Sequence, residues 1–159
     1  MRRIVAGVMM LLLVTACTPE QLAEWERVNN VVLSPQARAT VLSIAAAPAG
    51  SKCPQWYSTA VEAGWPASDW ARLDHVMWRE SRCIPTAHNP RGRDDSYGLI
   101  QLNMRAHRGW VRPLVNGDFS RLFDPATNLR IGRTLYEKAE DVYGCGWRPW
   151  TTRSTRWCG

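Results

Sequence analysis

The chain has 159 residues, enough for one folded domain around a single hydrophobic core. It carries 20 lysines and arginines against 14 aspartates and glutamates, a formal net charge of +6 that is not concentrated into runs. This modest excess suits an anionic partner such as a cell wall or lipid headgroups, and we expect no nucleic acid partner. Nine tryptophans accompany only two phenylalanines. We expect part of that excess in the core and the rest in a groove that stacks flat rings, sugars included.

The first residues have the features of a secretory signal peptide. A Met-Arg-Arg start is followed by an apolar run over residues 4–14 and then by small residues. The run is too short to span a membrane as a mature helix. Residues 14–17, Val-Thr-Ala-Cys, resemble a bacterial lipobox, so we expect residues 1–16 to be a lipoprotein-type signal peptide and Cys17 to become a lipid anchor in a membrane that faces the cell wall. The alternative is an ordinary signal peptide that releases a secreted protein with an incidental Cys17.

Two short helices are expected after Cys17. The first begins with proline and acidic residues in its first turn and ends near Asn29, and the second ends near Ala46. A segment with the composition of a linker follows. We interpret residues 17–50 as a tether and spacer and residues 51–159 as the functional domain, with packing of the spacer on the domain as the alternative.

The domain contains four cysteines, an even number that in an exported chain implies two disulfides with three possible pairings. We prefer Cys53–Cys83, which would clamp the middle of the domain to its start, and Cys145–Cys158, which would close a short C-terminal loop. Each would contribute about 2–4 kcal/mol. The cysteine spacings do not indicate a zinc site, and the histidines, which have no assigned role, share no metal-ligand spacing. We therefore expect no metal and no cofactor. The histidines are His75, His88 and His107.

Within the domain, apolar periodicity and end signals predict three helices. They lie at residues 56–63, 68–79 and 124–143, with Ser68 as the expected N-cap of the second. Residues 82–95 have the composition of a loop. Residues 97–103 are expected to be extended or turning and to lead into a helix, whereas residues 109–120 are expected to be a loop.

Glu80 lies on the apolar face of the helix expected at residues 68–79, because leucine, valine and methionine precede it by seven, four and three positions. An ionised carboxylate in such a place is costly unless it is paired, and burial favours the protonated form that a general acid needs. The alternative is a structural glutamate paired with an arginine. The flanking Arg79 and Arg82 are expected to be surface charges.

Three motifs occur in order: Glu80-Ser81, residues 96–103 (Ser-Tyr-Gly-Leu-Ile-Gln-Leu-Asn), and residues 122–132, which contain Asp-Pro-Ala-Thr-Asn-Leu-Arg-Ile-Gly. They resemble the helix-terminal Glu-Ser, the Gly-Leu-Met-Gln-Ile-type motif and the Asp-Pro-x-x-Asn-Ile-x-x-Gly helix start of the lytic transglycosylases in the lysozyme-like superfamily. The resemblance covers roughly residues 53–157. It implies a mostly α, lysozyme-like α+β fold with a small hairpin or loop lobe beside an active-site groove, and a peptidoglycan substrate.

The resemblance also implies an activity. A lytic transglycosylase cleaves the β-1,4 bond between N-acetylmuramic acid (MurNAc) and N-acetylglucosamine (GlcNAc) with one catalytic acid, here Glu80, and forms 1,6-anhydro-MurNAc. A hydrolytic muramidase of the same fold would need a second carboxylate, for which Asp94 and Asp95 are the candidates. Their alternative role is turn formation or pairing with Arg91 and Arg93, and we favour it. A rival from another class is a non-catalytic lipoprotein that binds the cell wall. We expect the protein to be a monomer whose partner is the glycan strands of peptidoglycan.

The remaining candidate residues are expected to contact substrate, each with a structural alternative. Ser81 would orient Glu80 or else cap the helix. Gln101 and Asn103 would bind N-acetyl groups or else satisfy backbone groups. The other candidates, whose alternative is packing in the core or lobe, are Ser96, Tyr97, Tyr136, Trp147 and Trp150, and we expect only one of the two tryptophans at the groove.

One family segment is missing. An Ala-Tyr-Asn-x-Gly sequence is usual late in such domains, but residues 146–151 read Gly-Trp-Arg-Pro-Trp-Thr. This departure puts in doubt which groups face Glu80 across the groove. The variant resembles compact, disulfide-bearing secreted forms in which aromatic residues close the site.

Overall fold

The structure is a computed structural model that describes residues 19–38, 46–92 and 94–158. The expected signal peptide and Cys17 therefore lie outside the described residues. Contacts divide the chain into two units, residues 1–45 and residues 46–159. In the part of the chain that is described, no helix is both long and apolar enough to cross a membrane.

The described part of the first unit contains helix α1 (Pro19–Asn29), as predicted. Residues 35–38 are also helical, and the rest of the second expected helix lies outside the described residues. Glu26 holds the turn between the two segments, because its carboxylate accepts the Leu33 N–H at 2.9 Å and pairs with Arg38 at 2.8 Å.

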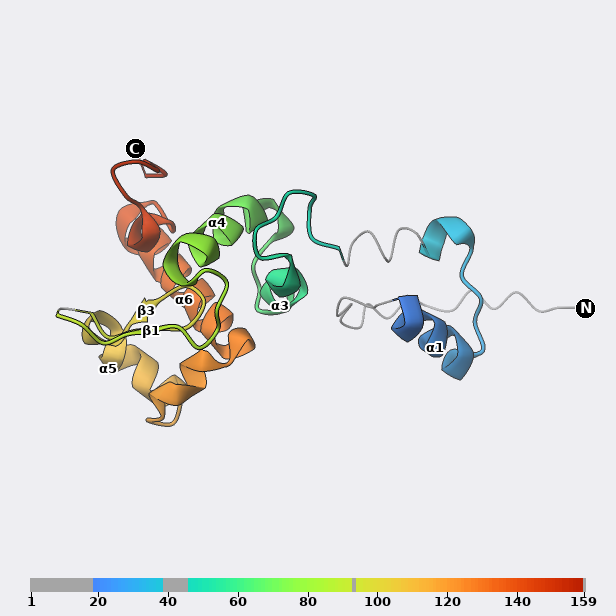
Figure 1. The fold of residues 1–159 in the computed structure, drawn as a ribbon, viewed down its shortest axis with the longest axis horizontal. Helices are drawn as coiled ribbons and strands as arrows, with labels where there is room; N and C mark the ends of the chain where they lie inside the picture. The colour runs from blue at the N-terminus through green and yellow to red at the C-terminus, as the bar shows by residue number, and fades with distance from the viewer. Residues whose placement is uncertain (1–18, 39–45, 93, 159) are drawn as a thin grey trace, which may run out of the picture. The chain divides into compact units, whose positions relative to one another are not determined.

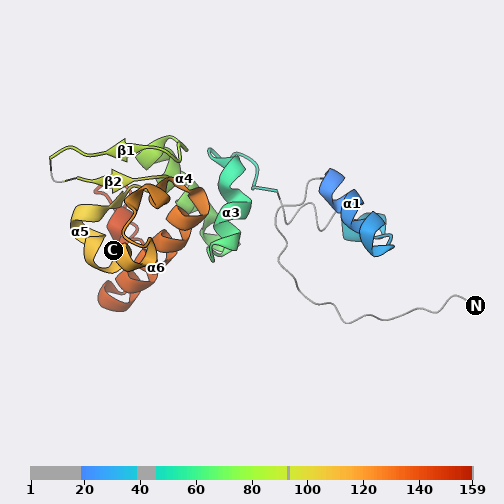
Figure 2. The same ribbon diagram turned by 90° about the horizontal axis from the view of Figure 1, so that it is seen from below.

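The second unit is mostly helical with one small sheet (Figure 1). The antiparallel sheet has the order β1 (His88–Asn89), β2 (Ser96–Tyr97), β3 (Leu102–Asn103), and it lies beside α5 (Figure 2). This arrangement confirms the predicted α+β class with a small hairpin lobe. The helices are α3 (Tyr57–Glu62), α4 (Trp70–Ser81), α5 (Met104–Leu114) and α6 (Pro125–Tyr143), with 3-10 turns at Pro54–Trp56, Ala67–Asp69, Phe119–Phe123 and Arg148–Trp150.

The start of α6 locks onto the turn between β2 and β3. Asn128 is fully buried; its side chain accepts the Ile100 N–H and donates to the carbonyls of Tyr97 and Leu122 at 2.9 and 3.0 Å. Gly98, with φ +76°, leaves no room for a Cβ atom, which would lie 2.3 Å from the Asn128 amide. Two of the sequence motifs therefore interlock, and both their glycine and their asparagine are needed for the close approach.

Helix α4 ends at Ser81, so Glu80 lies in its last turn. Arg82 caps it in the left-handed conformation with φ 56°, and the Cys83 N–H bonds back to the Met77 carbonyl at 3.3 Å. Cys83 is joined to Cys53, so the predicted disulfide clamps this end of the helix to the start of the unit. The buried Asp74 carboxylate supports the same junction by accepting the Cys53 N–H at 2.7 Å.

The C-terminal segment packs on the core through tryptophans. Trp147 is buried and stacks on Trp65 with ring centroids 5.4 Å apart, and Trp157 contacts Trp147 edge to face. The predicted disulfide Cys145–Cys158 closes this loop. The segment that replaces the expected Ala-Tyr-Asn-x-Gly sequence thus packs its tryptophans on the core and lies within a disulfide-closed loop.

Two element predictions were wrong. Residues 109–114 belong to α5, because Asn103 caps this helix by accepting the Arg105 N–H, and the buried Met104 and Val111 hold one face to the core. Its glycine and proline fall on the exposed side and in the last turn, where both are tolerated. Ser68 does not cap α4; it lies in a preceding 3-10 turn, and the capping position is Asp69.

Candidate active site

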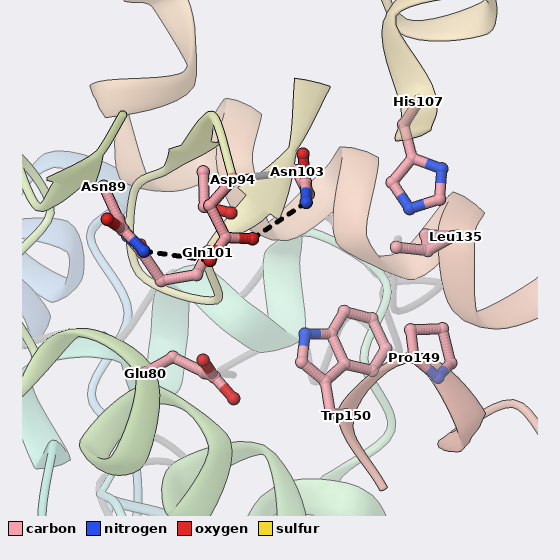
Figure 3. A pocket seen from close by; sticks show the side chains of 10 residues that line it. Glu80, Asn89, Asp94, Gln101, Asn103, His107, Leu135, Pro149 and Trp150 are labelled. Atoms are coloured by element: carbon pink, nitrogen blue, oxygen red, sulfur yellow. Dashed lines mark hydrogen bonds between the residues drawn. The ribbon is translucent and has the colours of Figure 1, made fainter. Parts of the chain in front are cut away.

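A cleft with a volume of about 240 Å³ lies between the end of α4, the small sheet, α5, α6 and the 3-10 turn at Arg148–Trp150 (Figure 3). Six of its lining residues are candidates from the sequence: Glu80, Asp94, Ser96, Gln101, Asn103 and Trp150. The other four are Asn89, His107, Leu135 and Pro149.

Glu80 projects from the end of α4 and faces the polar side chains of the sheet lobe across the cleft (Figure 3). The apolar residues used to place it are buried, as the helical spacing predicted: Leu73, Val76 and Met77. The carboxylate itself is not enclosed, since its side chain is 28% exposed. It is paired with Arg79, whose Nε and Nη2 both donate to Oε1, the former at 2.9 Å. Among the described residues, Oε2 accepts no hydrogen bond.

Arg79 is not the surface charge expected from the sequence. Its side chain is 25% exposed, Nη2 also donates to the Trp150 carbonyl at 2.7 Å, and the guanidinium lies 6.0 Å from the Trp157 ring. Nη1 is buried and has no partner among the described residues. Arg82, in contrast, is exposed and lies over the Trp78 ring. Arg79 therefore links Glu80 to the C-terminal loop.

Asp94 faces the cleft from the lobe opposite Glu80 (Figure 3). One carboxylate oxygen accepts the Asn103 amide and the other the Asn89 amide, both at 3.0 Å. The expected turn also exists, because the Asp94 N–H bonds to the Arg91 carbonyl at 2.9 Å. No ion pair joins its carboxylate to an arginine in the described part of the chain, so the carboxylate is held by neutral amides and directed at the cleft.

Asp95 is directed away from the cleft. Its carboxylate contacts His88 at 3.1 Å and Arg108 at 3.5 Å, and the hydrogen bond from His88 holds the pKa of Asp95 below its usual range. The two residues of β2, Ser96 and Tyr97, also point to opposite faces, because side chains alternate along a strand. Ser96 lines the cleft, whereas Tyr97 packs against His88 on the other face with tilted rings whose centroids are 4.3 Å apart, and burial there raises the pKa of the Tyr97 hydroxyl.

Gln101 and Asn103 line the cleft and also serve the backbone of the lobe. Gln101 has φ 51°, and its amide nitrogen donates to the carbonyls of Ala87 and Gly98. This fixes the nitrogen to the lobe and leaves the amide oxygen without a partner among the described residues. The alternative in which these side chains satisfy backbone groups is therefore observed, and both side chains also line the cleft.

Three further candidates, in addition to Asp95 and Tyr97, do not line the cleft. Ser81 is buried and donates to the Met77 carbonyl at 3.0 Å, which is the helix-end alternative. Tyr136 packs edge to face against Trp65 and Trp147 in the core. Trp147 is buried, whereas Trp150 lines the cleft and donates from Nε1 to the Ile100 carbonyl at 2.9 Å. The single tryptophan expected at the groove is thus Trp150.

Four lining residues were not anticipated. His107 lies one helical turn after Asn103 on α5, so the spacing of four positions could have placed it on the same face. Burial lowers the pKa of its imidazole, which accepts the Trp110 ring N–H at 3.4 Å. Asn89, Leu135 and Pro149 carry no signal of this kind, because only the fold brings their segments together.

The arrangement agrees with a comparison of the chain with known families. Residues 61–151 match the model described as Transglycosylase SLT domain. No curated protein and no solved structure matches the chain. The matched residues run from α3 through α4, the sheet, α5 and α6 to the turn that carries Trp150, and so include every element around the cleft. The match covers more than half of the chain and supports a transglycosylase-type action on peptidoglycan. The chain belongs to the SLT transglycosylase domain family, the lytic transglycosylase domain of the lysozyme-like superfamily.

Proposed function

We propose that the protein is a lytic transglycosylase that cleaves the β-1,4 bond between MurNAc and GlcNAc in peptidoglycan and leaves a 1,6-anhydro-MurNAc end. The observation that carries this proposal is the position of Glu80 at the helix end. It faces a cleft within the matched domain, with one carboxylate oxygen held and the other open.

In this mechanism Glu80, in its protonated form, gives its proton to the glycosidic oxygen while the bond to C1 of MurNAc breaks. The oxygen of the sugar's own N-acetyl group stabilises the positive charge at C1. The Glu80 carboxylate then takes the proton of the 6-hydroxyl, whose oxygen bonds to C1 and closes the anhydro ring. The acid is regenerated. The reaction consumes no water and needs no second carboxylate.

The contacts of Glu80 assign different tasks to its two oxygens. Arg79 holds Oε1 with two N–H groups, so Oε2 is the atom that exchanges the proton with the sugar. Ser96, Gln101 and Asn103 line the same cleft with polar groups and would receive the N-acetyl groups. Trp150 supplies an apolar wall against which a sugar ring can lie.

Analysis of the released muropeptides by mass spectrometry tests the proposal. The purified protein is expected to release anhydro-muropeptides from intact sacculi, and Glu80→Gln is expected to lower the rate by roughly 10²–10⁴-fold, because the amide cannot donate a proton as an acid. The control is Glu62→Gln, at the exposed end of α3, which should cleave like the wild type. Wild-type activity in Glu80→Gln would exclude the assignment, and glycan binding without cleavage by the wild type would favour a binding protein.

A hydrolytic muramidase is the second candidate, and the position of Asp94 across the cleft favours it over the non-catalytic binding protein. If Asp94 positions a water molecule, the products carry reducing MurNAc ends and Asp94→Asn abolishes their formation. If the transglycosylase proposal is correct, Asp94→Asn keeps the anhydro product and reduces the rate by about tenfold or less, because the neutral amide still bonds one of the two neighbouring asparagines. The products and the rate of this one variant separate the two reactions.

Export remains a proposal that rests on the N-terminal sequence and is supported by the two disulfides, which persist in oxidising compartments. We propose cleavage after residue 16, lipidation of Cys17, and a spacer from residue 17 to residue 50 that carries the domain of residues 51–159 to the wall. The mass of the N-terminal peptide of the mature protein checks this: a diacylglyceryl cysteine supports the anchor, and an unmodified peptide supports secretion.

A further inference from the structure

A second groove, with a volume of about 500 Å³, adjoins the catalytic cleft and is formed by α5, the C-terminal half of α6 and the turn at Arg148–Trp150. The cleft and this groove share four lining residues, so a molecule can pass from one into the other without leaving the protein surface. The residues specific to the adjoining groove are Ala106, Trp110, Lys138, Ala139, Val142, Tyr143 and Arg148.

The two sites differ in charge. Glu80 and Asp94 are the charged residues that line the catalytic cleft, whereas Lys138 and Arg148 are those that line the adjoining groove. Each cation lies over an aromatic ring: the Lys138 ammonium is 5.5 Å from the Trp110 ring centre, and the Arg148 guanidinium is 4.5 Å from the Tyr143 ring centre. These contacts hold the cations at the groove while leaving their hydrogen-bond donors for a ligand.

The acidic residues of the same part of α6 do not line the groove. Glu137 pairs with Arg133 at 3.0 Å, Glu140 accepts the Gly146 N–H, and Asp141 is exposed outside the groove lining. The groove therefore presents positive charge beside apolar side chains, of which Leu135 and Ala139 are buried and Ala106 and Val142 are exposed. Such a surface suits a short, flexible chain that carries small apolar side chains and carboxylates.

The occupant that fits this description is already attached to the proposed substrate. Each MurNAc carries a short peptide on its lactyl group, with alkyl side chains and free carboxylates. The catalytic cleft would repel those carboxylates because the Asp94 carboxylate lines it and pairs with no arginine in the described part of the chain, whereas the adjoining groove would attract them. We propose that this groove binds the stem peptide of the MurNAc unit being cleaved, with Lys138 and Arg148 contacting its carboxylates. The inference rests on the proposed function, because it assumes that the sugar backbone lies in the cleft.

The experiment compares two substrates: uncross-linked glycan strands that carry peptides, and the same strands freed of peptides by an amidase. The readout is the ratio of kcat/KM on the first to kcat/KM on the second. The double variant Lys138→Gln/Arg148→Gln is expected to lower this ratio three- to tenfold, as expected for two exposed ionic contacts. The control Arg112→Gln/Arg130→Gln removes the same charge from exposed positions of α5 and α6 outside both sites, and should keep the wild-type ratio.

A binding measurement separates failure of this inference from failure of the proposed function. Calorimetry in the Glu80→Gln background should show tighter binding of the disaccharide-peptide than of the free disaccharide. That difference should disappear when the peptide carboxylates are converted to amides or when Lys138 and Arg148 are replaced. An unchanged ratio of kcat/KM in the double variant, including the case of an equal loss on both substrates, would overturn the inference. Cleavage of neither substrate by the wild type would instead overturn the proposed function.

Discussion

At the scale of single residues, the contact that the sequence pattern did not reveal is the pairing of Glu80 with its neighbour Arg79. Consecutive residues on a helix point about 100° apart, so periodicity gives no reason for their side chains to meet. They meet because Arg79 is also held by the Trp150 carbonyl from the C-terminal loop. The ion pair proposed as the structural alternative for Glu80 thus exists within a candidate active site.

Replacing Arg79 tests whether this contact positions the acid. Arg79→Gln is expected to lower kcat by about 10- to 100-fold with a smaller change in KM, because Oε1 of Glu80 loses both donors and the carboxylate is no longer fixed. Arg79→Lys should restore only part of the rate, since one ammonium cannot reach Glu80 and Trp150 in the same fork geometry.

Arg82→Gln is the matched control, because it removes an exposed arginine two residues after Glu80 that contacts no cleft residue. It should cleave at the wild-type rate. Equal activity of Arg79→Gln and Arg82→Gln would show that Arg79 has no positioning role.

At the scale of elements, the lobe depends on the junction between the β2–β3 turn and the start of α6. The buried Asn128 side chain bonds to three backbone groups: the Ile100 N–H and the carbonyls of Tyr97 and Leu122. Since backbone groups buried without partners are costly, this one amide determines whether Gln101 and Asn103 are held at the cleft.

Asn128→Ala is therefore expected to lower the free energy of unfolding by about 3 kcal/mol or more, measured by urea denaturation. Asn128→Asp keeps an acceptor for the Ile100 N–H but loses both donors, and should also be strongly destabilised. The comparison variant is Arg130→Ala, an exposed residue two positions after Asn128 on α6, which should change stability by less than about 1 kcal/mol. Similar stability of the two alanine variants would contradict the role of the junction.

At the scale of the whole molecule, burial lowers the pKa of His107, and burial together with Lys52 and Arg79 lowers that of His75. In the unfolded chain both imidazoles take up a proton as the pH falls through about 6.5, whereas in the folded chain they do so at lower pH. The unfolded chain therefore binds more protons in this interval, and the free energy of unfolding falls as the solution is acidified from about pH 6.5.

Urea unfolding at pH 7.5 and pH 5.5 measures this loss. The double variant His75→Gln/His107→Gln should lose less stability between the two pH values than the wild type does. The low pKa of Asp95 acts with the same sign in a different interval, since its contribution is present above about pH 3.8 and disappears as the pH falls further. An equal loss in the wild type and the double variant would show that other groups govern the acid dependence.

Much of the architecture follows from local sequence. The helix caps at Asp124 and Gly144 define α6, and the spacing of Leu73, Val76 and Met77 identifies the buried face of α4. The cysteine count with loop lengths suggested the two disulfides that the structure contains. The helix features are local, so the sequence predicts them directly, whereas the four cysteines left three pairings, of which the preferred one is observed.

The sequence by itself determined a helical, disulfide-linked domain with one glutamate at the end of an apolar helix and two glycine-containing motifs that resemble a known family. Only the tertiary structure decided that Asp94 faces the cleft and Asp95 does not, that Trp150 lines the cleft while Trp147 lies in the core, and that Arg79 holds Glu80. Neighbouring residues of the same chemical type are distinguished by the face on which they emerge. That face is set by strand register and by the C-terminal loop packing against α4, which are contacts between residues far apart in the chain.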